Sequence, residues 1–137
     1  MRPDEAVAAP MKHRRFLRQP EQVAAARRFV TEAMARSEFR ETARLLVSET
    51  VTSMLDQGPS RLGDGMIKVA YARADDRLRV EVSDDGGPAR LRRRIQGVKP
   101  QSGRGLQLVQ DLASRWGVRE DTGGRTIWFE LVAPRPS

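Results

Sequence analysis

The sequence predicts an α+β fold, a two-layer sandwich in which helices cover one face of a mostly antiparallel sheet. Two kinds of periodicity carry this prediction. Met66–Arg73 and Arg77–Ser83 alternate apolar and polar residues, and a short acidic turn joins them, as in an antiparallel hairpin. Glu21–Arg36 and Arg40–Gln57 instead place their apolar residues at helical spacing. A chain of 137 residues suits one domain with its own core.

The chain divides into three parts. Residues 1–11 mix prolines, alanines and charges without a period, so we expect a disordered leader. The domain is expected over residues 12–133, with a tail at 134–137. Its first element is a short strand at His13–Arg18, in which Phe16 is the apolar anchor.

Two helices are expected next. Pro20 suits the first turn of the first helix, and Gly58-Pro59 ends the second. Each helix has an apolar face: Val23, Ala26, Phe29, Val30 and Ala33 in the first, and Ala43, Val47, Val51 and Met54 in the second. Helical spacing places Glu49, Ser53 and Asp56 on the other side of the second helix.

The C-terminal part is expected to contain one helix and two strands. Pro88–Ser102 is basic with little apolar pattern, so we expect a mobile loop or a frayed short helix. A helix follows over Leu106–Trp116, and Gly117 ends it. Strands at Val118–Asp121 and Arg125–Val132 close the fold. The expected core residues are Leu108, Val109 and Leu112 in the helix, and Ile127, Phe129 and Leu131 in the last strand.

Composition excludes several functional classes. The chain has no cysteine, so it can form neither a disulfide framework nor a thiolate metal site. No segment has the roughly 20 consecutive apolar residues that cross a bilayer. The N-terminus also lacks the apolar run of a secretion signal. We therefore expect a cytoplasmic protein that has no contact with a membrane.

The net charge of +7 raises the question of nucleic acid. Arg90, Arg92, Arg93 and Arg94 form a basic cluster that attracts phosphate from any source. Few aromatic residues lie among them to stack on bases. Polynucleotide binding is therefore an alternative, and we do not expect it to be the main function.

Two short segments carry candidate ligand chemistry. The predicted strand at Leu78–Ser83 runs directly into Asp84, Asp85 and two glycines, which suits a carboxylate held out to a hydrogen-bonding ligand. An acidic hairpin turn is the alternative. Gly103–Leu106 opens a helix, and glycines at a helix start expose backbone N–H groups that can bind phosphate. The alternative there is an ordinary loop.

Four segments in order resemble the nucleotide-binding fold shared by histidine kinases, gyrase-type ATPases and heat-shock chaperones of the ninety class. They are Leu45–Ser53, Val80–Gly87, Gly103–Leu106 and Gly123–Leu131. The resemblance covers roughly residues 13–132. It is strongest to the single-domain branch, the anti-sigma factors and serine kinases of bacterial partner-switching systems.

The resemblance implies an ATP site with a base side and a phosphate side. On the base side, Asp84 matches the aspartate that recognises the adenine amino group. Gly86 matches the glycine that gives the base room, and Thr126 matches a hydroxyl near the adenine. On the phosphate side, the matching residues are Gly103, Arg104, Gly105 and Leu106.

The metal side departs from the family. Glu49 matches the glutamate that positions or deprotonates the attacking group, with a solvated helix face as the alternative. Ser53 stands where the family has its Mg²⁺-binding asparagine, and a serine hydroxyl is a shorter and poorer ligand. The alternative for Ser53 is a plain exposed serine. Asp56 and Gln57 replace a basic residue and a histidine, and Pro88 replaces the second glycine of the base motif.

Two related functions follow from the resemblance. The first is an ATP-binding regulator that binds a sigma factor, an anti-sigma-factor antagonist or both, and that can act as a serine/threonine kinase on the antagonist. The second is a non-catalytic member that acts by protein binding alone, with weak or no nucleotide binding. The resemblance also implies a homodimer as one possible state.

Overall fold

The computed structural model describes residues 11–32, 34, 39–55, 65–74, 76–84, 106–121 and 124–133. Several expectations fall outside this part of the chain. They are the leader up to residue 10, the loop at 59–64, the basic segment at 88–102 and the tail at 134–137.

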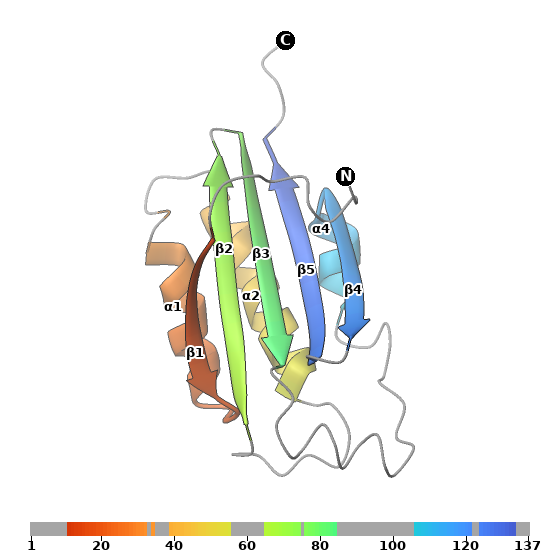
Figure 1. Cartoon of the computed structure of the whole chain (residues 1–137). Helices are drawn as coiled ribbons and strands as arrows, with labels where there is room; N and C mark the ends of the chain where they lie inside the picture. The colour runs from red at the N-terminus through yellow and green to blue at the C-terminus, as the bar shows by residue number, and fades with distance from the viewer. Residues whose placement is uncertain are drawn as a thin grey trace.

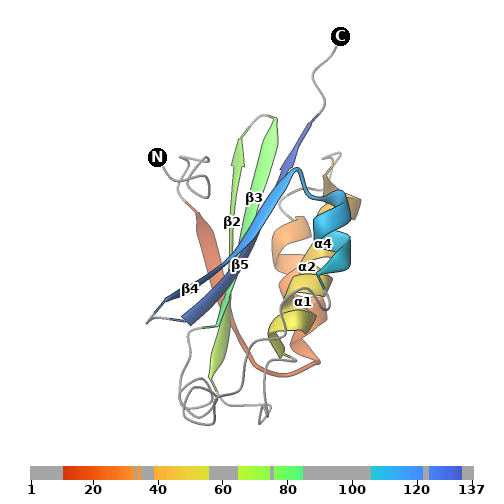
Figure 2. The same cartoon turned by 90° about the vertical axis from the view of Figure 1, so that its right-hand side faces the viewer.

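Five strands form one antiparallel sheet in the order β1-β2-β3-β5-β4 (Figure 1). They are β1 (Lys12–Leu17), β2 (Met66–Ala74), β3 (Arg77–Asp84), β4 (Arg115–Asp121) and β5 (Gly124–Val132). The helices are α1 (Gln22–Glu32), α2 (Arg40–Leu55) and α4 (Gln107–Leu112). All three lie on the same face of the sheet, and within the described ranges no helix covers the other face (Figure 2). The predicted α+β sandwich is therefore confirmed.

The register between strands fixes which side chains face the helices. Val69 of β2 lies opposite Val82 of β3, and Val82 lies opposite Ile127 of β5. Because successive side chains of a strand point to opposite faces, the alternation predicted for the hairpin sends these residues into the core. All three are buried. The hairpin at β2 and β3 forms as its sequence predicts.

The core fills the space between the helix layer and the sheet. The predicted apolar face of α2 is confirmed, since Ala43, Val47, Val51 and Met54 are all buried. In α1, Phe29 makes edge contacts with two aromatic rings of the sheet. Its ring centroid lies 6.2 Å from that of Phe16 and 5.2 Å from that of Tyr71. These contacts hold α1 against β1 and β2.

The third predicted helix is too long. Helix α4 ends at Leu112, and Trp116 belongs to strand β4. Gly117 lies within β4, opposite Trp128 of β5, and a Cβ atom at Gly117 would lie only 2.7 Å from Nε1 of that indole. The glycine therefore makes room for a ring across the strands rather than ending a helix. Leu112 is also not a core residue, since 45% of it is exposed.

None of the helices in the described ranges is both long enough and apolar enough to span a bilayer.

Candidate functional site

Asp84 occupies the last position of β3, on the face of the sheet that the helices cover. It lies in a row that crosses the sheet, opposite Ile67 of β2 and Arg125 of β5. The same row begins with Phe16 of β1, which lies opposite Ile67. Asp84 is 1% exposed, so its carboxylate lies in the interior at one end of the sheet. Burying a charge without a counter-charge is costly, so a cation is expected nearby.

That cation is Arg18. Its Nη1 donates a hydrogen bond to Oδ2 of Asp84 over 3.2 Å, and the arginine is fully buried. Arg18 follows β1 directly, and β2 lies between β1 and β3. The ion pair therefore spans one intervening strand, or two strand spacings of about 4.8 Å each. A long side chain with a planar, charged head suits that reach.

Arg125 adds a second buried guanidinium to the same end of the sheet. It lies directly opposite Asp84 in the β3–β5 register. Cross-strand pairs of this kind place their Cβ atoms about 5 Å apart. Two buried arginines, Arg18 and Arg125, therefore lie at the end of the sheet where Asp84 lies.

The sequence interpretation missed both arginines, although the signal was present. Arg18 follows Phe16 by two residues, and Arg125 precedes Ile127 by two residues. The period of two that places the apolar residues in the core places these arginines on the same face. Arg18 ends the predicted first strand on the same face as Phe16, so alternation alone predicts a buried position for it.

Thr126 does not lie beside Asp84. It is the register partner of Ser83, and its Oγ1 lies 3.0 Å from Oγ of Ser83. Adjacent residues in a strand point to opposite faces, so this hydroxyl pair lies on the helix-free face while Asp84 lies on the helix side. The structure therefore does not bring Thr126 together with the predicted base anchor.

The remaining predicted residues of the base and phosphate sides are described only in part. Leu106 immediately precedes α4, where it is buried, and its carbonyl oxygen accepts a hydrogen bond from the backbone N–H of Gln110. Its side chain is part of the core. Gly86, Gly103, Arg104 and Gly105 lie outside the described residues.

Glu49 and Ser53 lie one turn apart on α2. Glu49 is partly exposed, which fits both a role in a site and a solvated helix face. Ser53 is 3% exposed, so the alternative of a plain exposed serine is wrong. Thr50 on the same helix is also buried, and its hydroxyl donates to the carbonyl oxygen of Leu46.

These residues fit a bound Mg²⁺ ion only weakly. Mg²⁺ prefers several hard oxygen ligands in octahedral geometry. Ser53 offers one neutral hydroxyl, and Glu49 offers one carboxylate a turn away. Within the described ranges, no group of three or more His, Asp or Glu side chains could hold a metal ion. Asp56 lies outside those ranges.

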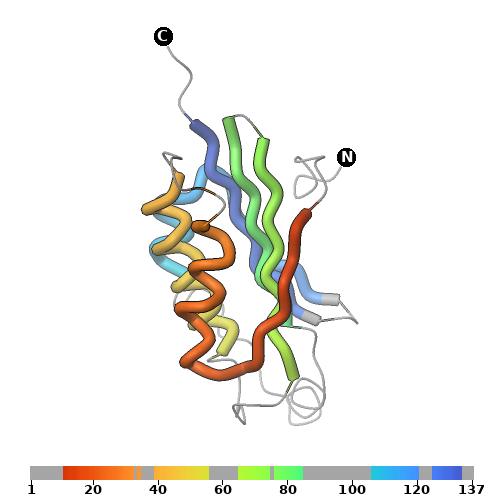
Figure 3. The backbone as a smooth tube through the Cα atoms, turned by 90° about the vertical axis from the view of Figure 1, so that its left-hand side faces the viewer, coloured from red at the N-terminus to blue at the C-terminus, as the bar shows by residue number. Residues whose placement is uncertain are grey.

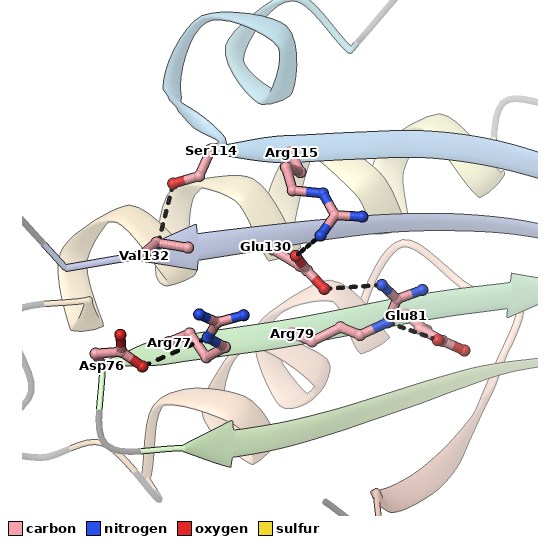
Figure 4. Close-up of polar contacts among 8 residues, drawn as sticks. All are labelled: Asp76, Arg77, Arg79, Glu81, Ser114, Arg115, Glu130 and Val132. Atoms are coloured by element: carbon pink, nitrogen blue, oxygen red, sulfur yellow. Dashed lines mark hydrogen bonds and ion pairs between the residues drawn. The ribbon is translucent and has the colours of Figure 1, made fainter. Parts of the chain in front are cut away.

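A second charged cluster lies on the helix-free face (Figure 4). Arg79 of β3 donates from Nη1 to Oε2 of Glu130 over 3.0 Å and from Nε to Oε2 of Glu81 over 2.9 Å. Nη1 of Arg115 lies 3.3 Å from Oε1 of Glu130. The guanidinium of Arg79 also stacks on the ring of Trp128, 4.4 Å from its centroid. We call these five residues the helix-free network.

The chain belongs to the family described as the histidine kinase-like ATPase domain, whose model matches residues 16–131. The match runs from the last two residues of β1 to the penultimate residue of β5, so it covers nearly all of the other four strands and all three helices. Domains of this family bind nucleotides. None of the curated proteins compared with the chain matches it.

Proposed function

We propose that this protein is an ATP-binding regulator of a bacterial partner-switching system that acts in the cytoplasm. The observation that carries the proposal is the buried carboxylate of Asp84 at the end of β3, in a chain of the histidine kinase-like ATPase family. An ionised carboxylate only accepts hydrogen bonds, and the amino group of adenine is a donor. Asp84 therefore supplies the acceptor for the base.

The charges around Asp84 support a nucleotide ligand. Arg18 and Arg125 place two positive charges at the same end of the sheet as the carboxylate, and positive charge attracts a polyphosphate. Glu49 on α2 is the residue that would receive a proton from the attacking hydroxyl if a phosphoryl group is transferred. Magnesium, if bound, would neutralise charge on the phosphates, and Ser53 of α2 stands at the position of the family's metal ligand.

The proposed partners are a sigma factor, an anti-sigma-factor antagonist or both. With phosphoryl transfer, the antagonist would be phosphorylated on a serine. The second candidate is a member that has lost catalysis and acts by protein binding alone. The burial of Ser53 favours this second candidate, because a buried hydroxyl is a poor substitute for the longer amide of asparagine as a metal ligand.

Calorimetric titration with ATP, with and without Mg²⁺, tests the nucleotide site. We expect saturable ATP binding that Asp84→Asn weakens, because the amide offers one acceptor oxygen in place of two and carries a donor. The absence of binding up to millimolar ATP would remove the proposal.

Restoring the family residue tests the choice between the two candidates. We expect Ser53→Asn to increase the dependence of ATP affinity on Mg²⁺ relative to the wild-type chain. A wild-type chain whose ATP affinity already depends strongly on Mg²⁺, and which phosphorylates an antagonist efficiently, would exclude the non-catalytic candidate.

A further inference from the structure

The ion pair between Arg18 and Asp84 joins two parts of the chain that the sequence separates by 66 residues. Both side chains are buried, at 0% and 1% exposure. A buried arginine spanning a neighbouring strand is costly to keep, because both the charge and the side-chain rotamers are constrained. The pair also fixes one oxygen of the Asp84 carboxylate, Oδ2, against the guanidinium.

The backbone fixes the position of Arg18 from both sides. Before it, β1 is held in register by β2, with Leu17 opposite Met66. After it, the N–H of Gln19 donates to the carbonyl oxygen of Leu17 over 2.8 Å, and the N–H of Gln22 donates to that of Gln19 over 2.9 Å. The chain thus turns from β1 into α1 (Figure 3). Backbone hydrogen bonds therefore hold the residues on both sides of Arg18.

We propose that Arg18 is a positioning residue for base recognition and makes the site select bases that carry an exocyclic amino group. The inference rests on the proposed function. The terminal torsion of an aspartate is broad, so an isolated carboxylate can present its oxygens in many orientations. The bond from Nη1 of Arg18 to Oδ2 restricts that rotation, so the base meets an acceptor in one orientation.

Replacing Arg18 could change ATP affinity in either direction, and each direction corresponds to a different role for the arginine. If Arg18 instead occupies space or hydrogen-bonding capacity that the base needs, its removal would strengthen nucleotide binding. The positioning role predicts the reverse, because a carboxylate that has lost its bond to Arg18 is less well oriented for a hydrogen bond from the amino group. The sign of the change in affinity therefore separates the two roles.

The experiment compares ATP with inosine triphosphate, in which a carbonyl replaces the amino group of adenine. Both nucleotides are titrated calorimetrically into the full chain and its variants. The variants are Arg18→Met, which removes the charge, and Arg18→Lys, which keeps the charge but not the planar fork. Arg79→Lys is the matched control, because Arg79 is also a buried arginine paired with a buried carboxylate. It lies five residues before Asp84 on β3, or about 16 Å along the strand.

We expect Arg18→Met to weaken ATP binding about tenfold, which corresponds to one hydrogen bond to a charged group. Arg18→Lys should weaken it about threefold, as partial rescue. Inosine triphosphate should bind all three chains within about twofold, so the preference for ATP falls with the ATP affinity. Arg79→Lys should leave that preference unchanged, even if the melting temperature falls. If Arg18→Met does not fold, Arg18→Lys alone decides the outcome.

Three results would overturn the inference. A folded Arg18 variant that keeps the wild-type preference for ATP assigns Arg18 a structural role only. A variant that binds ATP more tightly shows that Arg18 occupies space or hydrogen-bonding capacity that the base needs. A wild-type chain that binds neither nucleotide removes the proposed function and the inference together, whereas the first two results leave the proposed function standing.

Discussion

Two buried arginine–carboxylate pairs lie on opposite faces of the same sheet. On the helix side, Arg18 meets Asp84 across 3.2 Å, and on the helix-free face Arg79 meets Glu130 across 3.0 Å. In both pairs the two side chains are at most 2% exposed. The chemistry of the two pairs is nearly the same, and their surroundings differ.

The helix-free network is built within neighbouring strands. Arg79 and Glu130 are direct register partners, and Glu130 is also the register partner of Arg115. Each oxygen of Glu130 lies next to a guanidinium nitrogen, and Trp128 covers Arg79. The Arg18–Asp84 pair instead reaches across an intervening strand to the last residue of β3. The first pair joins direct register partners within the sheet, whereas the second places a carboxylate at the end of a strand, where we propose that the base binds.

The largest expected effect is on stability and concerns Glu130. Glu130→Gln should lower the free energy of unfolding by about 3–5 kcal/mol, because it removes the buried counter-charge of Arg79 and leaves that arginine paired with the more exposed Glu81. Denaturant unfolding measures the loss. Arg119→Gln is the control, since Arg119 pairs with Glu81 at 3.7 Å while about a third exposed, and its loss should cost at most about 1 kcal/mol. A small loss for Glu130→Gln would contradict the stabilising role of the network.

Asp84→Asn should show the next largest effect, on binding. We expect ATP affinity to fall between about tenfold and a hundredfold, the range for a hydrogen bond to a charged group. The variant also neutralises the carboxylate that pairs with Arg18 at 3.2 Å, so stability falls as well. Titration at a temperature well below the melting point separates the two effects. Unchanged ATP affinity in the folded variant would show that the base is bound elsewhere.

Gly117→Ala should lower the free energy of unfolding by about 1–3 kcal/mol, a typical cost of overpacking. The added Cβ would lie 2.7 Å from Nε1 of Trp128, so the indole must move and the stacked Arg79 with it. Thermal unfolding and the tryptophan fluorescence spectrum measure the change. In a Trp128→Phe background the same substitution should cost less. Equal costs in the two backgrounds would show that the ring does not require the glycine.

Thr126→Val should have the smallest effect. It removes one partner of the hydroxyl pair with Ser83, which costs about 0.5–1.5 kcal/mol of stability. Because Thr126 lies on the face opposite Asp84, ATP affinity should change by less than about twofold. Calorimetry of the variant measures this directly. A large loss of affinity would favour the role that the sequence resemblance assigns to this hydroxyl.

The sequence was a good guide to the fold wherever alternation or helical spacing decided the structure. The β2–β3 hairpin, the buried face of α2 and the core face of β5 all follow from periodicity. The sequence wrongly predicts Trp116 to be helical, because a glycine such as Gly117 often follows the end of a helix. Only the cross-strand position of Trp128 shows why a glycine is needed there.

The candidate site is harder to predict from the sequence than the fold is. Asp84 is predicted by its place at the end of a strand, and the faces of Arg18 and Arg125 follow from alternation. Their meeting does not, since it depends on the strand order, in which β1 pairs with β2 and β3 pairs with β5. Likewise, the burial of Ser53 depends on the elements around α2, which packs against α1, β3 and α4, and the helical pattern of α2 alone does not include those neighbours.

The place of β1 at the edge of the sheet ties the base site to the order of folding. The β2–β3 and β4–β5 hairpins close short loops, whereas pairing Phe16 with Ile67 closes a loop of about fifty residues. The entropic cost of that closure is larger than for either hairpin, and β1 lies at the edge of the sheet, so β1 is expected to dock after the hairpins form and to open before them. Arg18 directly follows β1, so its contact with Asp84 requires that β1 is docked on the sheet. Amide exchange along β1 would therefore report on the same event that completes the site.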